Sequence, residues 1–136
     1  MLKKINHIAI AVNNIEEAAG FYQDILGLNL SGVETVTTQK TRVGFLGIGE
    51  SNIELVQPSD KNSPLVKFLE TKGQGIHHIC FEVDDVEAEV KALLEKGAKL
   101  IDQIPRPGAH NTKVAFVHPK SSSGVLIELC ELPKDR

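Results

Sequence analysis

The chain contains an internal repeat, and this repeat constrains its fold more than any other feature. Residues 7–16 (HIAIAVNNIE) match residues 78–87 (HICFEVDDVE) at an offset of 71 residues, with His, Ile, Val and Glu coinciding. Two further pairs of segments match in the same order: 43–46 with 114–117, and 53–55 with 127–129. The last pair is offset by 74 residues, and the three extra residues fall in the polar loop 119–124, where insertions cost little. Matches in a common order predict two copies of one supersecondary unit.

Each copy has the hydrophobic pattern of a strand, a helix and three further strands. The predicted ranges are 5–12, 14–26, 30–38, 41–48 and 52–57, then 77–83, 85–96, 99–103, 112–118 and 124–131. Asn13 and Asp84 are each followed by Glu three residues later, a spacing that predicts helix N-caps. Gly27 and Gly97 predict the helix ends.

The predicted fold class is α+β, with two paired βαβββ modules forming a concave mixed sheet. We expect a single domain, because 136 residues make one ordinary core. Module 1 spans residues 1–57, a polar linker spans 58–75, and module 2 spans 76–136.

Alternation along the strands places one His or Glu per strand on the face opposite the large apolar residues. These residues are His7, Glu54, His78 and Glu128. A single strand His or Glu more often has a structural or solvent-facing role, but equivalent positions in both modules favour a shared metal ion. The predicted core under the helices is Ile8, Ile10, Val12, Leu55, Ile79, Phe81, Val83 and Leu129.

Two imidazoles and two carboxylates neutralise a divalent ion and suit Co, Ni, Zn, Mn or Fe. Four ligands leave two positions open in an octahedral shell. Structural zinc sites are closed and rich in Cys, so an open shell indicates catalysis. No P-loop, GxGxxG or CxxC motif is present, so no organic cofactor site is predicted.

The remaining histidines and the cysteines favour structural roles. His77 alternates with His78 and should point to the helix side or to an edge. His118 either orders a substrate loop or caps a strand end, and Lys120 either meets an anionic group or is solvated. Cys80 and Cys130 are interpreted as reduced, buried thiols that face the same side as the metal site.

Composition excludes several classes of function. A net charge of −3 and 4% aromatic residues give no support for nucleic-acid binding. No apolar run approaches the roughly 18 to 20 residues of a membrane span, and no signal peptide pattern follows Lys3 and Lys4. Two cysteines make a poor disulfide framework, which indicates a cytoplasmic protein.

The paired modules resemble the vicinal oxygen chelate superfamily, which includes glyoxalase I, bleomycin resistance proteins and extradiol dioxygenases. Within it, several stretches are similar to the methylmalonyl-CoA epimerase family. These stretches are residues 7–12, 63–69, 75–80, 116–120 and 124–129.

The resemblance implies a metal site formed by His7, Glu54, His78 and Glu128, with Gln in place of Glu54 in some members. It implies one divalent ion per chain, with Co²⁺ favoured over Mn²⁺, Ni²⁺, Zn²⁺ or Mg²⁺, and a homodimer. The implied reaction interconverts the C2 epimers of an acyl-CoA thioester, methylmalonyl-CoA, through a metal-stabilised enolate. An acidic base of some members has no clear counterpart in residues 39–45. The repeat would place Glu128 and Glu54 on opposite sides of the metal, so these are the candidate catalytic groups, with Glu128 favoured because its segment is more family-like.

Two other functions remain open at this point. One is a lactoylglutathione lyase of the glyoxalase I type, which binds its metal with the same arrangement of four ligands. The other is a metal-free small-molecule binding protein of the same fold.

Overall fold

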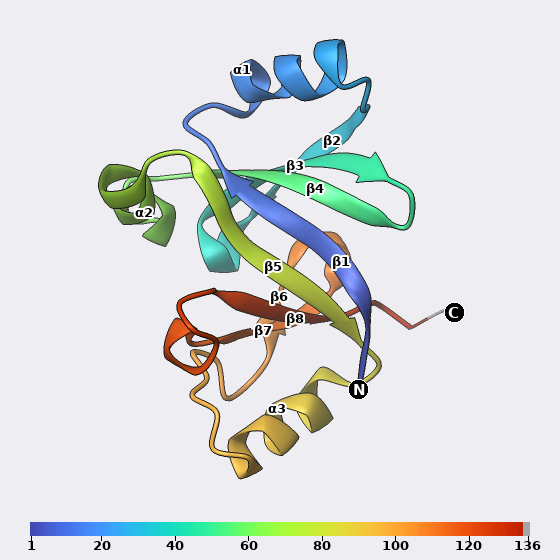
Figure 1. The fold of residues 1–136 in the computed structure, drawn as a ribbon, viewed down its shortest axis with the longest axis vertical. Helices are drawn as coiled ribbons and strands as arrows, with labels where there is room; N and C mark the ends of the chain where they lie inside the picture. The colour runs from blue at the N-terminus through green and yellow to red at the C-terminus, as the bar shows by residue number, and fades with distance from the viewer. Residues whose placement is uncertain (135–136) are drawn as a thin grey trace. The chain divides into compact units, whose positions relative to one another are not determined.

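The structure, a computed structural model, describes residues 1–134. The chain divides into two compact units, and Figure 1 traces their order along it. The N-terminal unit is His7–His77, and the C-terminal unit is the chain from His78 onwards together with Met1–Asn6. The predicted grouping of two modules into one domain stays a prediction.

The N-terminal unit combines a mixed four-stranded sheet with a helical face. Its elements are β1 (Leu2–Ala11, of which His7–Ala11 belong here), α1 (Ile15–Gly20), the π-helix η1 (Phe21–Ile25), β2 (Leu30–Val36), the 3₁₀ turn η2 (Thr37–Gln39), β3 (Thr41–Ile48), β4 (Ser51–Pro58) and α2 (Pro64–Lys72). The strand order is β2-β3-β4-β1, with β1 parallel to β4 and the other pairs antiparallel. The helix predicted over 14–26 is present, but its second half has π geometry.

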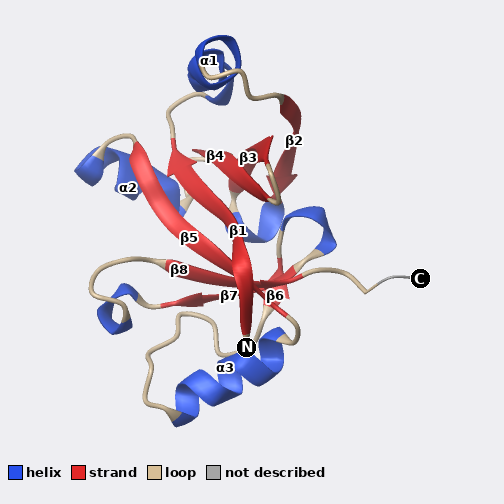
Figure 2. Cartoon of the chain, turned by 45° about the vertical axis from the view of Figure 1, so that its right-hand side comes forward, coloured by secondary structure: helices blue, strands red, loops and turns tan. Residues whose placement is uncertain are grey.

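The C-terminal unit repeats this order with shorter strands (Figure 2). Its elements are β5 (Gly75–Val83, from His78), α3 (Val86–Glu95), β6 (Arg106–Pro107), the 3₁₀ turns η3 (Ala109–Asn111) and η4 (Pro119–Ser121), β7 (Lys113–Val117) and β8 (Ile127–Glu131). The strand order is β5-β8-β7-β6, again with one parallel pair, β5 with β8. Within residues 1–134, no helix has the length and apolar character needed to cross a membrane.

The predicted fold class, α+β with two similar modules, is confirmed by this element order. The helix ends are confirmed as well, because Gly27 and Gly97 have φ of 82° and 89°, a region that favours glycine.

The predicted N-caps are each wrong by one residue. The capping side chains are Asn14, which accepts from the backbone N–H of Glu17, and Asp85, which accepts from that of Ala88. The helices start one residue later because their first amides bond to distant side chains. The N–H of Ile15 donates to Gln57 Oε1 at 2.9 Å.

The same capture occurs at the start of α3, where the N–H of Val86 donates to Glu131 Oε1 at 3.0 Å. Val86 is fully buried, so an unpaired amide there would be costly. Gln57 and Glu131 occupy equivalent positions on β4 and β8, which extends the internal repeat to the helix starts.

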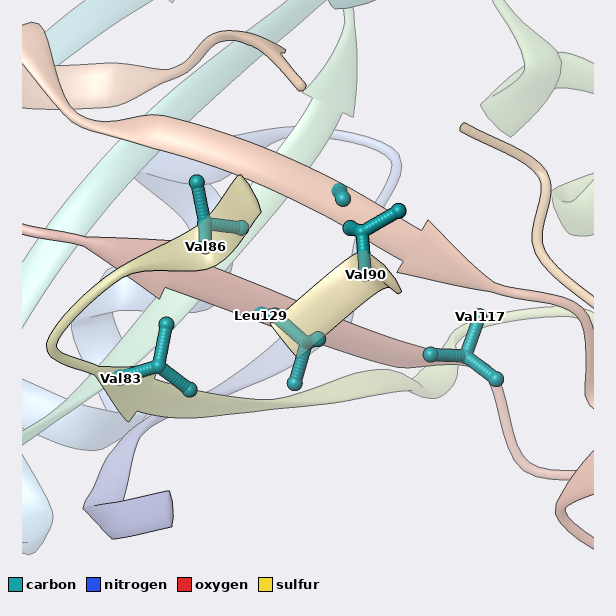
Figure 3. Close-up of a cluster of buried hydrophobic side chains, with 6 residues drawn as sticks. Val83, Val86, Val90, Val117 and Leu129 are labelled. Atoms are coloured by element: carbon teal, nitrogen blue, oxygen red, sulfur yellow. The ribbon is translucent and has the colours of Figure 1, made fainter. Parts of the chain in front are cut away.

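The hydrophobic cores lie between sheet and helix, as the alternation predicts. In the C-terminal unit, α3 packs on β5, β7 and β8 through Val83, Val86, Val90, Ala115, Val117 and Leu129 (Figure 3). In the N-terminal unit, α1 covers the sheet through Val12, Ile15, Ala19, Leu46 and Leu55. Ile10 and Phe81 pack against these clusters while partly exposed, and Ile8 and Ile79 are half-buried.

The strand predicted over 99–103 does not form. Leu100 makes only an isolated bridge with Val117, and the edge strand is the two-residue β6 instead. Asp102 is the physical reason, because its Oδ2 accepts from the N–H of Phe116 at 2.9 Å. A side chain thus takes the place of a backbone acceptor, and Pro105 and Pro107 cannot donate to a ladder.

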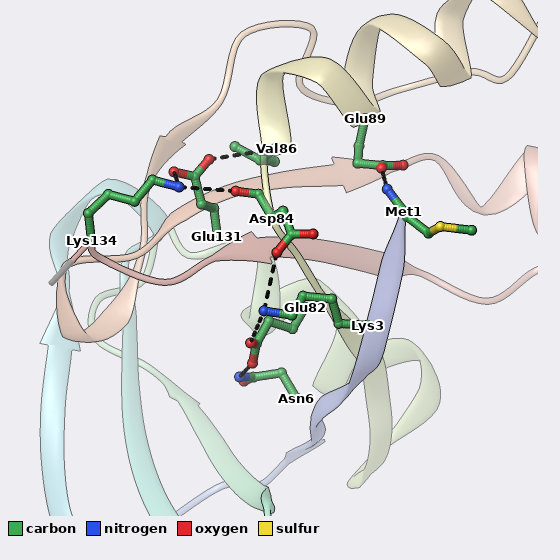
Figure 4. A network of polar contacts seen from close by, with 9 residues as sticks. All are labelled: Met1, Lys3, Asn6, Glu82, Asp84, Val86, Glu89, Glu131 and Lys134. Carbon is green, nitrogen blue, oxygen red and sulfur yellow. Dashed lines mark hydrogen bonds and ion pairs between the residues drawn. The ribbon is translucent and has the colours of Figure 1, made fainter.

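Residues 1–6 are attached to the C-terminal unit by polar contacts (Figure 4). Lys3 Nζ lies 3.2 Å from Asp84 Oδ1 and 3.7 Å from Glu82 Oε2. Asn6 donates to Glu82 at 3.3 Å. The hydrogen bond to Asp84 is the main cause that raises the pKa of Lys3. The buried Glu82 carboxylate therefore receives a cation and an amide from the start of the chain.

Replacement of Glu16 by glutamine should remove an acid-sensitive part of the stability. A bidentate ion pair with Arg42, at 3.0 and 2.5 Å, lowers the pKa of Glu16 from 4.5 to about 2. Since the folded-state pKa is depressed, this contribution is complete above about pH 4.5 and is lost as the pH falls towards 2. Urea denaturation should give a small difference between wild type and E16Q at pH 7 that shrinks at pH 3. An equal difference at both pH values would contradict the assignment.

Candidate metal and active site

The N-terminal unit places His7 and Glu54 side by side on adjacent parallel strands. Ala9 of β1 is the register partner of Glu54 of β4, and His7 precedes Ala9 by two residues on the same face. His7 Nδ1 lies 3.1 Å from Glu54 Oε2, and the two residues are 6% and 8% exposed. The predicted pair of this unit is thus assembled and buried.

The C-terminal unit repeats the arrangement with His78 and Glu128. Cys80 of β5 is the register partner of Glu128 of β8, and His78 again precedes that partner by two residues. His78 Nε2 lies 2.8 Å from Glu128 Oε1, and the exposed fractions are 7% and 5%. In both units the His therefore lies two residues before the register partner of the Glu.

Each pair has the donor chemistry and the spacing of two neighbouring metal ligands. Nitrogen and oxygen donors lie about 2.0 to 2.2 Å from a divalent ion, so two at right angles are about 3 Å apart. The His–Glu separations of 3.1 and 2.8 Å match this value. Without an ion the same distances describe hydrogen-bonded pairs. Both pairs thus fit a metal, each within its own unit.

Each carboxylate also has an aromatic register partner. Phe45 of β3 is paired with Glu54, and Phe116 of β7 is paired with Glu128. The Phe116 ring meets the His78 ring edge-on, with centroids 5.4 Å apart. Both phenylalanines are buried, so each carboxylate lies beside a surface that excludes water. The internal repeat matches Phe45 with Phe116, and this match was the sequence signal that could have placed both residues beside the candidate ligands.

The two cysteines and His77 make packing contacts. Cys80 and Cys130 are buried and form no disulfide, and they cluster with Val114 and Phe116 on the face that carries Glu128. His77 points away from His78 and packs on Phe68 of α2, with ring centroids 4.8 Å apart. The structural role predicted for His77 agrees with this contact.

His118 caps the turn that directly follows the end of β7. Its Nδ1 accepts from the N–H of Lys120 at 3.0 Å and so opens the turn Pro119–Ser121. Lys120 belongs to that turn and is exposed.

Residues 6–116 match the family model described as Glyoxalase/Bleomycin resistance protein/Dioxygenase superfamily. The chain belongs to this superfamily. It is 40% identical over 129 residues to the mitochondrial methylmalonyl-CoA epimerase of Homo sapiens, covering 94% of this chain and 73% of that protein. It is 39% identical over 131 residues to the ethylmalonyl-CoA/methylmalonyl-CoA epimerase of Cereibacter sphaeroides, covering 95% and 98%.

A solved structure described as methylmalonyl-CoA epimerase in complex with methylmalonyl-CoA and NH₄⁺ has the same fold. Its TM-score is 0.93 at 32% identity, covering 97% of this chain and 96% of that one. The glyoxalase-like fold and the expectation that the chain is an epimerase are confirmed by these similarities.

Proposed function

We propose that the chain interconverts the C2 epimers of methylmalonyl-CoA by removing and returning one proton at C2. The observation that carries this proposal is the repeated, buried His–Glu pair in a chain about 40% identical to epimerases. Relatives solved with methylmalonyl-CoA support an acyl-CoA thioester as substrate.

His7, Glu54, His78 and Glu128 would hold one divalent ion together in this proposal. The support is that both pairs are buried, have neighbouring-ligand spacing and occupy equivalent register positions. Such an ion supplies Lewis acidity, which stabilises the negative charge of an enolate. The two imidazoles and two carboxylates suit a divalent first-row metal, and the family resemblance favours Co²⁺, with Mn²⁺, Ni²⁺, Zn²⁺ or Mg²⁺ as alternatives. The homodimer and the cytoplasmic location stay predictions.

Proton transfer in this proposal falls to the carboxylates of the chain. Epimerisation needs a group on each face of a planar enolate, because one base on one face would return the proton to its origin. Glu54 and Glu128 are the candidates, since one lies in each unit. The buried Phe45 and Phe116 rings beside them would limit competition from water for the C2 proton.

The test is deuterium incorporation at C2 of methylmalonyl-CoA in D₂O, with Co²⁺-reconstituted protein and with protein stripped by a chelator. We expect exchange and epimer conversion with the reconstituted protein, and loss of both after stripping. A glutathione hemithioacetal is the matched substrate for the lactoylglutathione lyase alternative. Turnover of the hemithioacetal without C2 exchange would reject the proposal in favour of the lyase.

A further inference from the structure

The face of the C-terminal unit that carries His78 and Glu128 has a cation on its edge strand. Arg106 of β6 is the register partner of Val114, and Phe116, two residues along β7, is the partner of Glu128. Partners share a face of a sheet, as do residues two apart in a strand. Arg106 therefore belongs to the same face as Phe116 and Glu128.

One aromatic ring connects this cation to the candidate metal site. The Arg106 guanidinium carbon lies 5.5 Å from the Phe116 ring centroid, within the range of a cation–π contact. The same ring meets His78 edge-on at 5.4 Å. Arginine, phenylalanine and histidine thus form one continuous row of side chains within the C-terminal unit.

An acid that is hydrogen-bonded to β7 lies beside the guanidinium. Arg106 Nε lies 3.2 Å from Asp102 Oδ1, while Asp102 Oδ2 accepts from the N–H of Phe116 at 2.9 Å. The Asp102 side chain is only 13% exposed, and that of Arg106 is 35% exposed. The guanidinium therefore contacts both an acid and an aromatic ring and is still partly exposed.

We propose that Arg106 binds the free carboxylate of the substrate and selects malonyl-type thioesters over simple acyl thioesters. This inference rests on the proposed function. A carboxylate is the group that distinguishes these two substrate classes, and a guanidinium offers five donors in a planar fork that matches it. The phosphates of coenzyme A are separated from the thioester by the whole pantetheine arm. Arg106 contacts the same ring that contacts His78, so its cation is better placed to bind the carboxylate than the phosphates.

The test compares the binding of malonyl-CoA and acetyl-CoA to Co²⁺-loaded protein by calorimetry. In R106Q, the affinity for malonyl-CoA should fall about 10- to 100-fold, the size of a lost charge-assisted hydrogen bond, while acetyl-CoA binding stays within about twofold. R106K keeps the charge but not the fork, and its loss should be intermediate. R42Q is the matched control, because Arg42 forms a similar ion pair with Glu16 in the other unit and should leave both affinities unchanged.

The outcomes separate this inference from the proposed function. Equal loss of both ligands in R106Q would assign Arg106 to the phosphates, and no loss would leave it a structural residue; either result overturns the inference. Melting temperatures show whether R106Q is folded, and R106K provides the second variant if it is not. If wild type catalyses C2 exchange and prefers malonyl-CoA while R106Q behaves identically, only the Arg106 assignment fails. If wild type has no preference for malonyl-CoA, the proposed substrate class fails, and this inference with it.

Discussion

Replacement of His78 by alanine should remove the metal ion and the C2 exchange activity together. The imidazole lies 2.8 Å from Glu128 and is buried, so its loss removes one donor from the candidate ligand set. Loss of an orienting group next to a metal already costs about 10- to 100-fold in affinity, and loss of a ligand should cost at least as much. Metal content by mass spectrometry and deuterium exchange at C2 are the two measurements.

His77→Ala is the matched control for this variant. His77 is the adjacent residue of the same strand, but its ring packs on Phe68 rather than on the metal-site face. We expect H77A to retain metal and exchange activity while losing some thermal stability. An H78A protein that keeps a full equivalent of metal would show that His78 is not a ligand.

Replacement of Glu128 by glutamine should leave the metal bound and abolish most of the C2 exchange. Glutamine keeps an oxygen donor of similar shape but cannot accept a proton as a base. The loss of a general base typically costs about 10² to 10⁴-fold in rate. The measurement is deuterium incorporation per bound metal ion, so that a variant with partial metal loss is not mistaken for an inactive one.

Glu54→Gln is the matched comparison, because Glu54 occupies the equivalent position in the other unit. If each carboxylate serves one face of the enolate, both variants should lose epimerisation. Any exchange that each variant retains should then be confined to one epimer. Near-normal turnover by metal-loaded E128Q would make Glu128 a ligand alone, and an unidentified side chain or water would have to move the proton.

The internal repeat allowed the strand faces of the four candidate ligands to be predicted without coordinates. A strand alternates its side chains with a period of two, so matching His7 with His78 and Glu54 with Glu128 also determined their faces. The structure pairs each His with the Glu of its own unit. The helix ends were equally predictable, because glycine at positions 27 and 97 tolerates the positive φ that stops a helix.

Tertiary contacts decided the features that depend on residues far apart in the chain. Sequence spacing predicted the N-cap of the second helix at Asp84, yet the helix starts after Asp85 because Glu131, 45 residues beyond Val86, captures the first amide. The strand predicted over 99–103 is absent because the Asp102 carboxylate occupies the amide of Phe116.

The placement of Arg106 depends on tertiary structure most of all. It shares a two-residue strand with Pro107 and directly follows Pro105, so no alternation could assign its face. Its partner across the sheet and the aromatic ring under its guanidinium come from β7, and its acidic ion-pair partner comes from the segment before β6. Periodicity reports the environment of a residue within its own strand, whereas contact between segments is set by the packing that brings them together.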